Sequence, residues 1–286
     1  MQLVQNQKTI LIVGLGLIGG SYAKGLKKLG FRVIAIDTRQ EAIDYAVKHH
    51  IIDEGFSHND PPAIHSADIL IFALYPKVFL QWIEENQQHL RAGAILTDVT
   101  GVKSCLVYQI QDTLRKDVEF IAAHPMAGRE VYGVENSDDA IFRGAHSIVV
   151  PTEQNTPNAI ELCEDIGKLL GFARISRLSP EEHDEMIGFV SQLTHAIAVS
   201  LMTCSDNESL VDYTGDSFRD LTRIARINDA MWSELFLLNK DSLLRQMDLF
   251  IKEFSDLRND LSDGNVEKMR EKMRLSTERR KLFDKK

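Results

Sequence analysis

Short apolar runs alternate with helix-like segments from the N-terminus to about position 178. The first run (KTILIV, 8–13) is followed by a helix-like stretch at 21–29 and a second run at 31–36. Repeated alternation of this kind indicates a mostly parallel sheet with helices on both faces. The other predicted strands are 69–74, 94–99, 120–123, 147–150 and 173–175, and the other predicted helices are 40–49, 79–88, 103–114 and 157–170.

The pattern changes at Ser179. Ser179 to Glu182 (SPEE) forms a capping box with proline at the first helical position. Beyond it no segment reads as a strand. We therefore predict two domains, an α/β domain at 1–178 and an all-helical domain at 179–286. Apolar residues recur at helical spacing in the second domain, at Met186, Ile187, Val190, Leu193, Ile197 and Leu201. Further helix-like stretches are 217–227, 230–262, with a break considered within it, and 266–283.

Long amphipathic helices often bury an outer apolar face against a second copy of the chain. The helical domain therefore predicts a homodimer.

A glycine-rich turn, GLGLIG, joins the first predicted strand to the first predicted helix. Gly14 permits a tight turn, Gly16 lets a pyrophosphate approach the backbone, and Gly19 lets the helix pack close to the strand. Leu17 and Ile18 lie between the last two glycines, and we count them among the cofactor-binding residues. The free N–H groups and the dipole at the N-terminus of the helix favour phosphate. The segment is typical of a Rossmann-type dinucleotide-binding domain.

The second predicted strand ends in Asp37, which follows Gly19 at a spacing close to that of the dinucleotide-binding motif. An acid at this position accepts hydrogen bonds from the ribose hydroxyls, so we predict NAD rather than NADP as the cofactor. Arg39 lies close by and could instead meet a 2′-phosphate, which leaves NADP as the alternative.

Composition narrows the class of protein. Of the 286 residues, 44% are hydrophobic and 26% are charged, as in an ordinary soluble globular protein. We see no apolar run near the roughly 20 residues of a membrane helix and no secretory signal. The net charge of −9 argues against general nucleic-acid binding. We therefore expect a cytoplasmic protein without membrane or nucleic-acid partners.

The cysteines and histidines do not predict a metal site. Cys105, Cys163 and Cys204 are scattered and form no CxxC pair. His183 and His195 lie on one predicted helix, but they are separated by roughly 3.3 helical turns and so do not share a face.

Two segments that follow predicted strands carry candidate chemistry. His124 comes directly after the strand at 120–123, in a loop that we expect to present its side chain. A histidine beside a nicotinamide can take a proton from a substrate hydroxyl, but a structural histidine at a strand end is the alternative. The run DVTGVK from Asp98 could place Thr100 and Lys103 near the cofactor, or Asp98 could merely cap the next helix.

Further candidates lie in the helical half. Ser191 and His195 are four residues apart and share a helix face, so they could line a pocket, although His195 could instead be a core or dimer-contact residue. Asp220 and Arg223 could form a surface ion pair, or the acid could orient the arginine to grip a carboxylate. Trp232 could wall an apolar pocket or belong to the core.

Together these parts resemble the TyrA family, the prephenate and arogenate dehydrogenases of tyrosine biosynthesis. The resemblance covers nearly the whole chain. Its most specific pieces are HPMAG with the following Glu130, the segment from His183-Asp184 to SQLTH, and FRDLTRIA with Trp232. It implies a dinucleotide-binding domain followed by a helical dimerisation domain. It also implies NAD-dependent oxidative decarboxylation of prephenate to 4-hydroxyphenylpyruvate and CO2.

The resemblance implies roles for individual residues. His124 matches the catalytic histidine that hydrogen-bonds the ring hydroxyl of the substrate, and Arg223 matches the arginine that binds a substrate carboxylate. His195, which we group with these two, and Ser191 match pocket residues near the substrate. Glu130 matches an acid at the mouth of the pocket.

Asp220 and Trp232 match residues that support the arginine and the pocket wall. Two positions depart from the family pattern. Many relatives have serine where this chain has Gly101, and Thr100 is the candidate replacement for that hydroxyl. Gln192 stands where some relatives have histidine.

Three other functions compete with this interpretation. Arogenate differs from prephenate only by an amino group on the side chain, and no residue distinguishes the two. A β-hydroxyacid dehydrogenase usually relies on a lysine in its helical domain, whereas this chain offers His124 with Arg223. A non-catalytic NAD-sensing protein is expected to lack this histidine and arginine.

Overall fold

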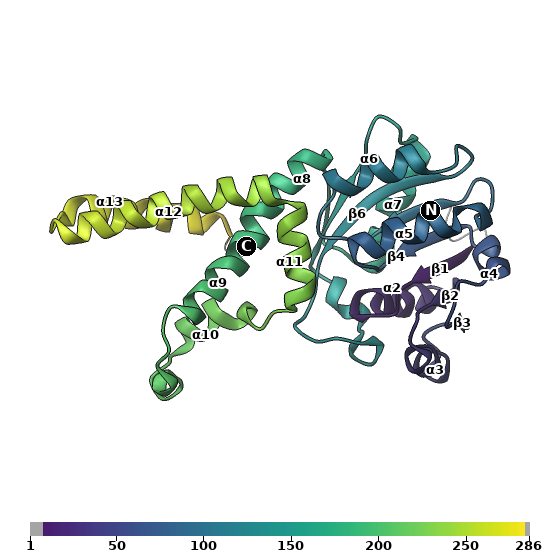
Figure 1. Cartoon of the computed structure of the whole chain (residues 1–286), viewed down its shortest axis with the longest axis horizontal. Helices are drawn as coiled ribbons and strands as arrows, with labels where there is room; N and C mark the ends of the chain where they lie inside the picture. The colour runs from purple at the N-terminus through teal and green to yellow at the C-terminus, as the bar shows by residue number, and fades with distance from the viewer. Residues whose placement is uncertain (1–7, 284–286) are drawn as a thin grey trace. The chain divides into compact units, whose positions relative to one another are not determined.

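The computed structural model describes residues 8–283 and divides the chain into two compact units, residues 1–239 and 240–286. The first unit contains an eight-stranded sheet with the order β3-β2-β1-β4-β5-β6-β7-β8 (Figure 1). Neighbouring strands are parallel from β3 to β6, β7 is antiparallel to β6, and β8 is parallel to β7. The mostly parallel sheet is therefore confirmed. The strands are β1 (Thr9–Val13), β2 (Arg32–Ile36), β3 (Glu54–Phe56), β4 (Ile69–Phe72), β5 (Ile95–Asp98), β6 (Glu119–Met126), β7 (His146–Val150) and β8 (Arg174–Arg177).

Helices cover both faces of this sheet. Side chains alternate along β1, so Ile10 and Ile12 enter one apolar cluster while Leu11 and Val13 enter the other. This two-sided burial explains the continuous apolar runs of the sequence. The first cluster includes residues of α2 (Leu17–Lys28), α3 (Gln40–Lys48) and α7 (Pro157–Leu170). The second includes residues of α4 (Pro61–Ser66), α5 (Pro76–Asn86) and α6 (Ser104–Thr113). Short 3₁₀ turns are η1 (Gln87–His89), η2 (Val134–Asn136) and η3 (Asp139–Phe142).

The strand order reverses between β1 and β4. From β1 the chain builds outward through β2 to β3, and it then returns to place β4 on the other side of β1. In open α/β sheets, ligands bind beyond the carboxyl ends of the strands at such a switch point. The glycine turn after β1 lies at this place.

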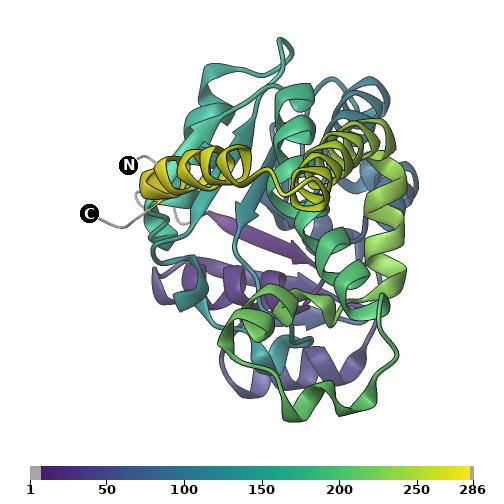
Figure 2. The same cartoon turned by 90° about the vertical axis from the view of Figure 1, so that its left-hand side faces the viewer.

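A long helical stretch follows the sheet. The helix α8 (Pro180–Ile187) begins with the predicted capping box, in which the hydroxyl of Ser179 accepts from the backbone N–H of Glu182 and the carboxylate of Glu182 accepts from the N–H of Ser179. It continues through the π-helical turn η4 (Gly188–Leu193) into α9 (Thr194–Thr203). Three short helical segments follow, green in Figures 1 and 2: η5 (Glu208–Asp212), α10 (Asp216–Thr222) and the 3₁₀ turn η6 (Arg223–Ala225). The helix α11 (Asp229–Leu238) comes after them.

The second unit is a helical hairpin. Its helices are α12 (Lys240–Ser262) and α13 (Val266–Arg280), followed by the 3₁₀ turn η7 (Lys281–Phe283). The two helices lie side by side (Figure 1), and Lys272 of α13 pairs with Glu253 of α12 at 3.0 Å. Gly264, with a φ of 66°, forms the turn between them.

Several element boundaries differ from the sequence prediction. The strand predicted at 120–123 extends to Met126, because β7 pairs with it and sets His124 opposite Ile148. The histidine therefore lies within a strand and not in the loop after it. The elements β3 and α4 were missed. The break considered within the helix-like stretch 230–262 is found at Asn239, between α11 and α12.

One helix bears on the prediction that no apolar run approaches membrane length. The continuous helix Pro180–Thr203 is long and apolar enough to cross a membrane by length and composition alone, and residues 186–203 carry no Asp, Glu, Lys or Arg. A single helix of this kind is a weak indication, since the core helix of a soluble protein passes the same test. Its start is tied to the sheet domain, because Asp184 accepts hydrogen bonds at the N-terminus of α6.

Candidate active site

The three glycines of the turn after β1 have different surroundings. Gly14 has a φ of +98°, and its N–H donates to the carbonyl of Ile36 at 2.8 Å. A Cβ on Gly14 would lie 2.5 Å from the carbonyl oxygen of Ala73, and one on Gly19 would lie 1.9 Å from that of Gly14. A Cβ on Gly16 would meet nothing within 4 Å. Two glycines thus permit close packing, while Gly16 faces open space.

The N-terminus of α2 begins at this open space. Gly16 is the N-cap residue and offers no side-chain cap, and the first turn holds no acidic residue. The side chain of Leu17 is buried and that of Ile18 packs against the core. The first N–H groups of a helix lack intrahelical partners. This end of α2 therefore fits the pyrophosphate of a dinucleotide.

Asp37 follows β2 beside the turn. One carboxylate oxygen accepts from the N–H of Leu15 at 2.7 Å, and the other accepts from the N–H of Arg39 at 2.9 Å. The guanidinium of Arg39 also donates to Asp37, at 3.3 Å, and to the carbonyl of Leu15, at 3.1 Å. The acid is thus held at the edge of the cofactor cradle, as a ribose-binding role requires. The exposed Arg39 is tied to Asp37 in this structure.

His124 is half-buried and contacts a second histidine. Its Nδ1 lies 2.9 Å from Nε2 of His183, which is fully buried. The Nδ1 of His183 lies 2.8 Å from the carboxylate of Asp184. That carboxylate accepts from the backbone N–H groups of Lys103 and Ser104, each at 2.8 Å. A chain of polar contacts therefore connects His124 to the N-terminus of α6.

The surroundings of His124 favour its neutral form. Burial lowers its pKa well below the usual 6.5, and the nearby positive charge of Lys103 lowers it further, together with the electrostatic effect of His183. Burial also lowers the pKa of His183, despite its carboxylate partner. A neutral imidazole is the form that can accept a proton.

A buried polar cluster lies next to the histidine. The Nζ of Lys103 is fully buried and donates to Asp98 at 2.6 Å and to the hydroxyl of Thr100 at 3.0 Å. The other oxygen of Asp98 accepts from the N–H of Ala123 at 3.0 Å. The Thr100 hydroxyl, which also contacts Asp98, is engaged by protein groups inside the cluster. This placement argues against both the substrate contact we predicted for Thr100 and its replacing the family serine.

Gly101 leaves room beside His124. A Cβ on Gly101 would lie 3.9 Å from Cε1 of His124 and 3.7 Å from the side chain of Leu235, both ordinary contacts. The helix α11, which carries Leu235, therefore passes the sheet loop that holds Gly101.

The same helix reaches the pocket residues of the helical domain. Trp232 of α11 stacks on His195 with ring centroids 3.7 Å apart. The Nδ1 of His195 lies 2.8 Å from the backbone carbonyl of Ser191, which makes this nitrogen the donor. Burial lowers the pKa of His195. The structure thus brings His195, Ser191 and Trp232 together.

Arg223 pairs with Glu130 from the loop after β6, and both side chains are largely exposed. The predicted pairing of Arg223 with Asp220 was wrong, since within residues 8–283 no ion pair joins them. The helix α10 ends at Thr222 and Arg223 starts a 3₁₀ turn, so the i, i+3 geometry of an α-helix is lost. Arg223 therefore pairs with Glu130, which is distant in the sequence, and not with the nearby Asp220.

Gln192 has a structural place at the π-helical turn. It is buried and donates to the carbonyl of Leu235 at 3.1 Å, and its amide oxygen accepts from Asn239 at 2.8 Å. Asn239 also donates to the carbonyl of Asp184 at 2.8 Å. These bonds connect the end of α11 to α8 and η4.

Sequence reasoning assigned no role to Asp184, Leu235 or Asn239, and it used His183 only to argue against a metal site and, with Asp184, to mark the family resemblance. The adjacent pair His183-Asp184 just after a capping box was the available signal, but its partner His124 lies 59 residues away.

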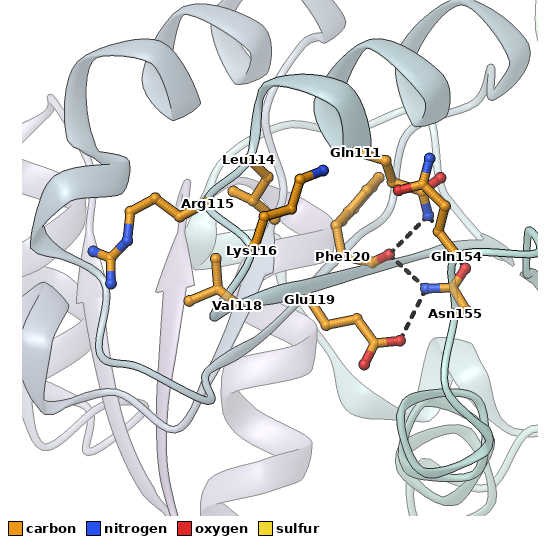
Figure 3. A pocket seen from close by; sticks show the side chains of 9 residues that line it. All are labelled: Gln111, Leu114, Arg115, Lys116, Val118, Glu119, Phe120, Gln154 and Asn155. Atoms are coloured by element: carbon orange, nitrogen blue, oxygen red, sulfur yellow. Dashed lines mark hydrogen bonds between the residues drawn. The ribbon is translucent and has the colours of Figure 1, made fainter.

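A small pocket lies elsewhere, at the start of β6 (Figure 3). It is lined in part by Gln111 and Asn155, whose side-chain amides both donate to the carbonyl of Phe120. Glu119 accepts from Asn155 there. These groups satisfy one another at the amino end of the strand, away from His124.

Comparison with known families decides the classification. A family model described as "Prephenate dehydrogenase, nucleotide-binding domain" matches residues 22–175, more than half of the chain. The chain belongs to the prephenate dehydrogenase family. A second model of this family, described as the dimerization domain, matches residues 179–275.

Individual prephenate dehydrogenases match most of the chain. The enzyme of Bacillus subtilis (strain 168) is 30% identical over 272 residues, which cover 93% of this chain and 73% of that protein. The enzyme of Lactococcus lactis subsp. cremoris (strain MG1363) is 33% identical over 87% of this chain and 70% of its own length. The crystal structure of prephenate dehydrogenase from A. aeolicus, in complex with hydroxyphenyl propionate and NAD+, superposes with a TM-score of 0.88. It is 31% identical and covers 97% of this chain and 98% of that chain.

Proposed function

We propose that this protein is an NAD-dependent dehydrogenase that oxidises and decarboxylates prephenate to 4-hydroxyphenylpyruvate and CO2. Its place in the prephenate dehydrogenase family supports this reaction. The observation that carries the proposal is His124 on the strand β6, whose lowered pKa keeps it neutral and whose ring lies beside Gly101.

The chain's own residues bind and orient the reactants. NAD, when bound, supplies the hydride acceptor. His124 accepts the proton of the ring hydroxyl as the carbonyl develops, because its lowered pKa keeps it neutral at physiological pH. Loss of the ring carboxylate then makes the ring aromatic, so the reaction is effectively irreversible.

The substrate is held by residues of the helical domain. Arg223 binds a substrate carboxylate, and Glu130, its present partner, lies at the mouth of the site. His195 and Ser191 line the pocket, and Trp232 forms a wall by stacking on His195. Asp220 stays a weaker candidate, since it does not pair with Arg223.

The dinucleotide is held by the turn after β1. Gly14, Gly16 and Gly19 shape the cradle, and the N–H groups of Leu17 and Ile18 would hold the phosphates of a bound dinucleotide. Asp37 would bind the ribose hydroxyls. NAD is therefore preferred over NADP, because a 2′-phosphate would face the carboxylate of Asp37.

The helical domain supports a homodimer. Met186, Phe189 and Val190 of the long helix and Met202 near its end are each about half exposed in the single chain. A second copy covers such a face, consistent with the matched dimerization domain. Light scattering is expected to give twice the mass of one chain, and a monomer at micromolar concentration would contradict this.

We further propose the domain boundary near residue 178 and a cytoplasmic location. The two family models meet at residues 175 and 179, which supports this boundary, although residues 179–239 pack in one compact unit with the sheet. No membrane or nucleic-acid partner forms part of the proposal.

Arogenate is a second candidate substrate, and one observation favours it. The Nδ1 of His195 donates to the carbonyl of Ser191, so Nε2 of the neutral ring is an acceptor. The side chain of arogenate carries an ammonium donor, whereas that of prephenate carries only acceptors.

The experiment that tests the reaction follows its products. With NAD and prephenate, the wild-type protein should form NADH, CO2 and 4-hydroxyphenylpyruvate in equal amounts. His124→Asn should lower kcat by roughly 10²–10⁴-fold, as removal of a general base does. Its Kd for NAD should stay close to that of the wild type. NADH without CO2 would refute decarboxylation, and unchanged turnover in the variant would remove His124 from the mechanism.

A further inference from the structure

Three side chains form a continuous buried contact that ends on His124. Nδ1 of His124 lies 2.9 Å from Nε2 of His183, and Nδ1 of His183 lies 2.8 Å from Oδ1 of Asp184. His183 is fully buried and Asp184 nearly so. Neither residue was assigned a role by the sequence, and His183 contacts His124 directly.

The proton positions follow from the fixed end of this chain. Both oxygens of Asp184 accept backbone N–H groups, Oδ1 from Lys103 and Oδ2 from Ser104, each at 2.8 Å. Although burial raises the pKa of Asp184, its hydrogen bonds from His183 and Ser104 leave the pKa below its usual value. Asp184 is thus a carboxylate, and it can only accept.

The direction of each hydrogen bond is then determined. Nδ1 of His183 must donate to Asp184. Because His183 is neutral, its Nε2 carries a lone pair and must accept. Nδ1 of His124 must therefore be the donor to His183, and Nε2 of the neutral His124 is the bare nitrogen.

We infer that His183 and Asp184 are positioning residues that lock His124 in its Nδ1–H tautomer, so that Nε2 is the atom that takes the substrate proton. This deepens the proposed function and rests on it for the identity of the substrate. Gly101 lies beside this ring, with its Cβ position 3.9 Å from Cε1, the carbon between the two ring nitrogens.

The hydrogen bonds of this chain keep their direction when the base takes up a proton. When Nε2 of His124 gains the hydroxyl proton, the ring becomes an imidazolium that donates from Nδ1 to His183. His183 still accepts this bond and still donates to Asp184, so no hydrogen bond of the chain has to reverse. No further proton needs to leave the site during the hydride transfer.

The first test reads the tautomer directly. Protein labelled with ¹⁵N-histidine is studied at pH 7.5 by NMR correlations between ring nitrogens and ring carbon-bound protons, and His124→Asn identifies the signals. We expect a protonated Nδ1 and a bare Nε2 on His124. A protonated Nε2 would overturn the inference. This result does not depend on the substrate, so it stands even if neither prephenate nor arogenate is turned over.

The second test uses a matched pair of substitutions at His183. His183→Gln places an amide oxygen near the position of Nε2 and can still accept from His124. His183→Asn is too short to reach His124 but can still donate to Asp184. We expect His183→Asn to lower kcat by roughly 5- to 150-fold, the cost of leaving one buried donor unpaired, with KM nearly unchanged.

His183→Gln should recover most of the lost kcat, and its His124 signals should keep the wild-type tautomer. Melting temperature and the Kd for NAD, measured on both variants, separate positioning from folding. Equal kcat values in the two variants, with equal melting temperatures, would contradict a positioning role. If His183→Asn does not fold, the tautomer of His124 in the wild-type protein decides whether the inference holds.

Discussion

At the level of single residues, His124 is set up as a base by its surroundings, although no carboxylate touches its ring. Burial and the charge of Lys103 both lower its pKa, and the nearest carboxylate in its hydrogen-bond chain, Asp184, lies beyond His183. The base is therefore neutral before the reaction.

The lowered pKa of His124 predicts the pH dependence of activity. A group whose pKa is lowered stays neutral as the pH falls through 6.5 and gains its proton only well below that value. We expect kcat/KM to be constant between pH 8 and pH 6.5 and to fall about tenfold per pH unit below the lowered pKa. An acid limb centred at or above pH 6.5 would show that His124 is not held in this environment.

Arg223 predicts a loss of binding. Arg223→Ala removes a charged grip on a carboxylate, so it should mainly raise KM, by roughly 10- to 150-fold for a charge-assisted hydrogen bond of about 1.5–3 kcal/mol. Arg219→Ala is the matched control, because Arg219 pairs with the exposed Asp216 at 3.5 Å. A normal KM in Arg223→Ala, or an equal rise in both variants, would remove Arg223 from the site.

Replacing Gly101 by serine is predicted to raise kcat/KM above that of the alanine variant. Its Cβ position has only ordinary contacts, so both Gly101→Ala and Gly101→Ser should fold normally. The serine would add a hydroxyl beside His124, and we expect its kcat/KM to exceed that of the alanine variant by about 2- to 12-fold, the value of one hydrogen bond of about 0.5–1.5 kcal/mol. Steady-state kinetics decide this, and equal values for the two variants would show that the hydroxyl finds no partner.

Residue types near the site could be predicted, but their partners could not. His124 and Arg223 were found because local sequence marks them, one after an apolar run and the other in a cationic helical segment. Their contacts with His183 and Glu130 span 59 and 93 residues, and only the folded chain brings these groups together. The pairing of Asp220 with Arg223 was predicted from their spacing on a helix. That spacing does not reveal that the helix changes to a 3₁₀ turn at Arg223.

At the scale of elements, the turn after β1 joins folding and cofactor binding in one short segment. Gly19 lets α2 pack against the carbonyl of Gly14, while Gly16 leaves the space in front of the helix open. The two glycines therefore serve different purposes although they belong to one motif.

This difference predicts opposite outcomes for two alanine substitutions. Gly16→Ala should keep the melting temperature of the wild type and weaken NAD binding, because its methyl group enters only the open cradle. Gly19→Ala should destabilise the fold by about 1–3 kcal/mol, as overpacking does. Thermal unfolding and NAD titration of both variants test this. Similar losses of stability in both would contradict the assignment.

Elements made by local patterns were predicted well, and those made by distant pairing were not. The unit β1–turn–α2–β2 and the helix α7 follow from apolar runs and caps. The strand β3 has only three residues, EGF, and exists because it pairs with β2. The extension of β6 past Pro125 likewise depends on β7, which returns to the sheet only after the turns η2 and η3.

At the scale of the whole molecule, the mostly parallel sheet with helices on both faces and the helical second half were predictable from the change of periodicity at Ser179. The division into compact units was not, because residues 179–239 pack with the sheet and only 240–286 form a separate unit. Asp184 contacts α6 and Asn239 contacts α8, which explains why residues 179–239 pack with the sheet. No local sequence pattern predicts these contacts.

The most direct test of the central claim is the initial rate of NADH formation by the purified protein. Prephenate and arogenate are each supplied with NAD, and the same two reactions are run with NADP. We expect rapid reduction with prephenate and NAD, and little or none with NADP because of Asp37. Reduction of NAD with arogenate but not with prephenate would leave the mechanism standing and identify arogenate as the substrate. No reduction with either substrate would contradict the proposed function.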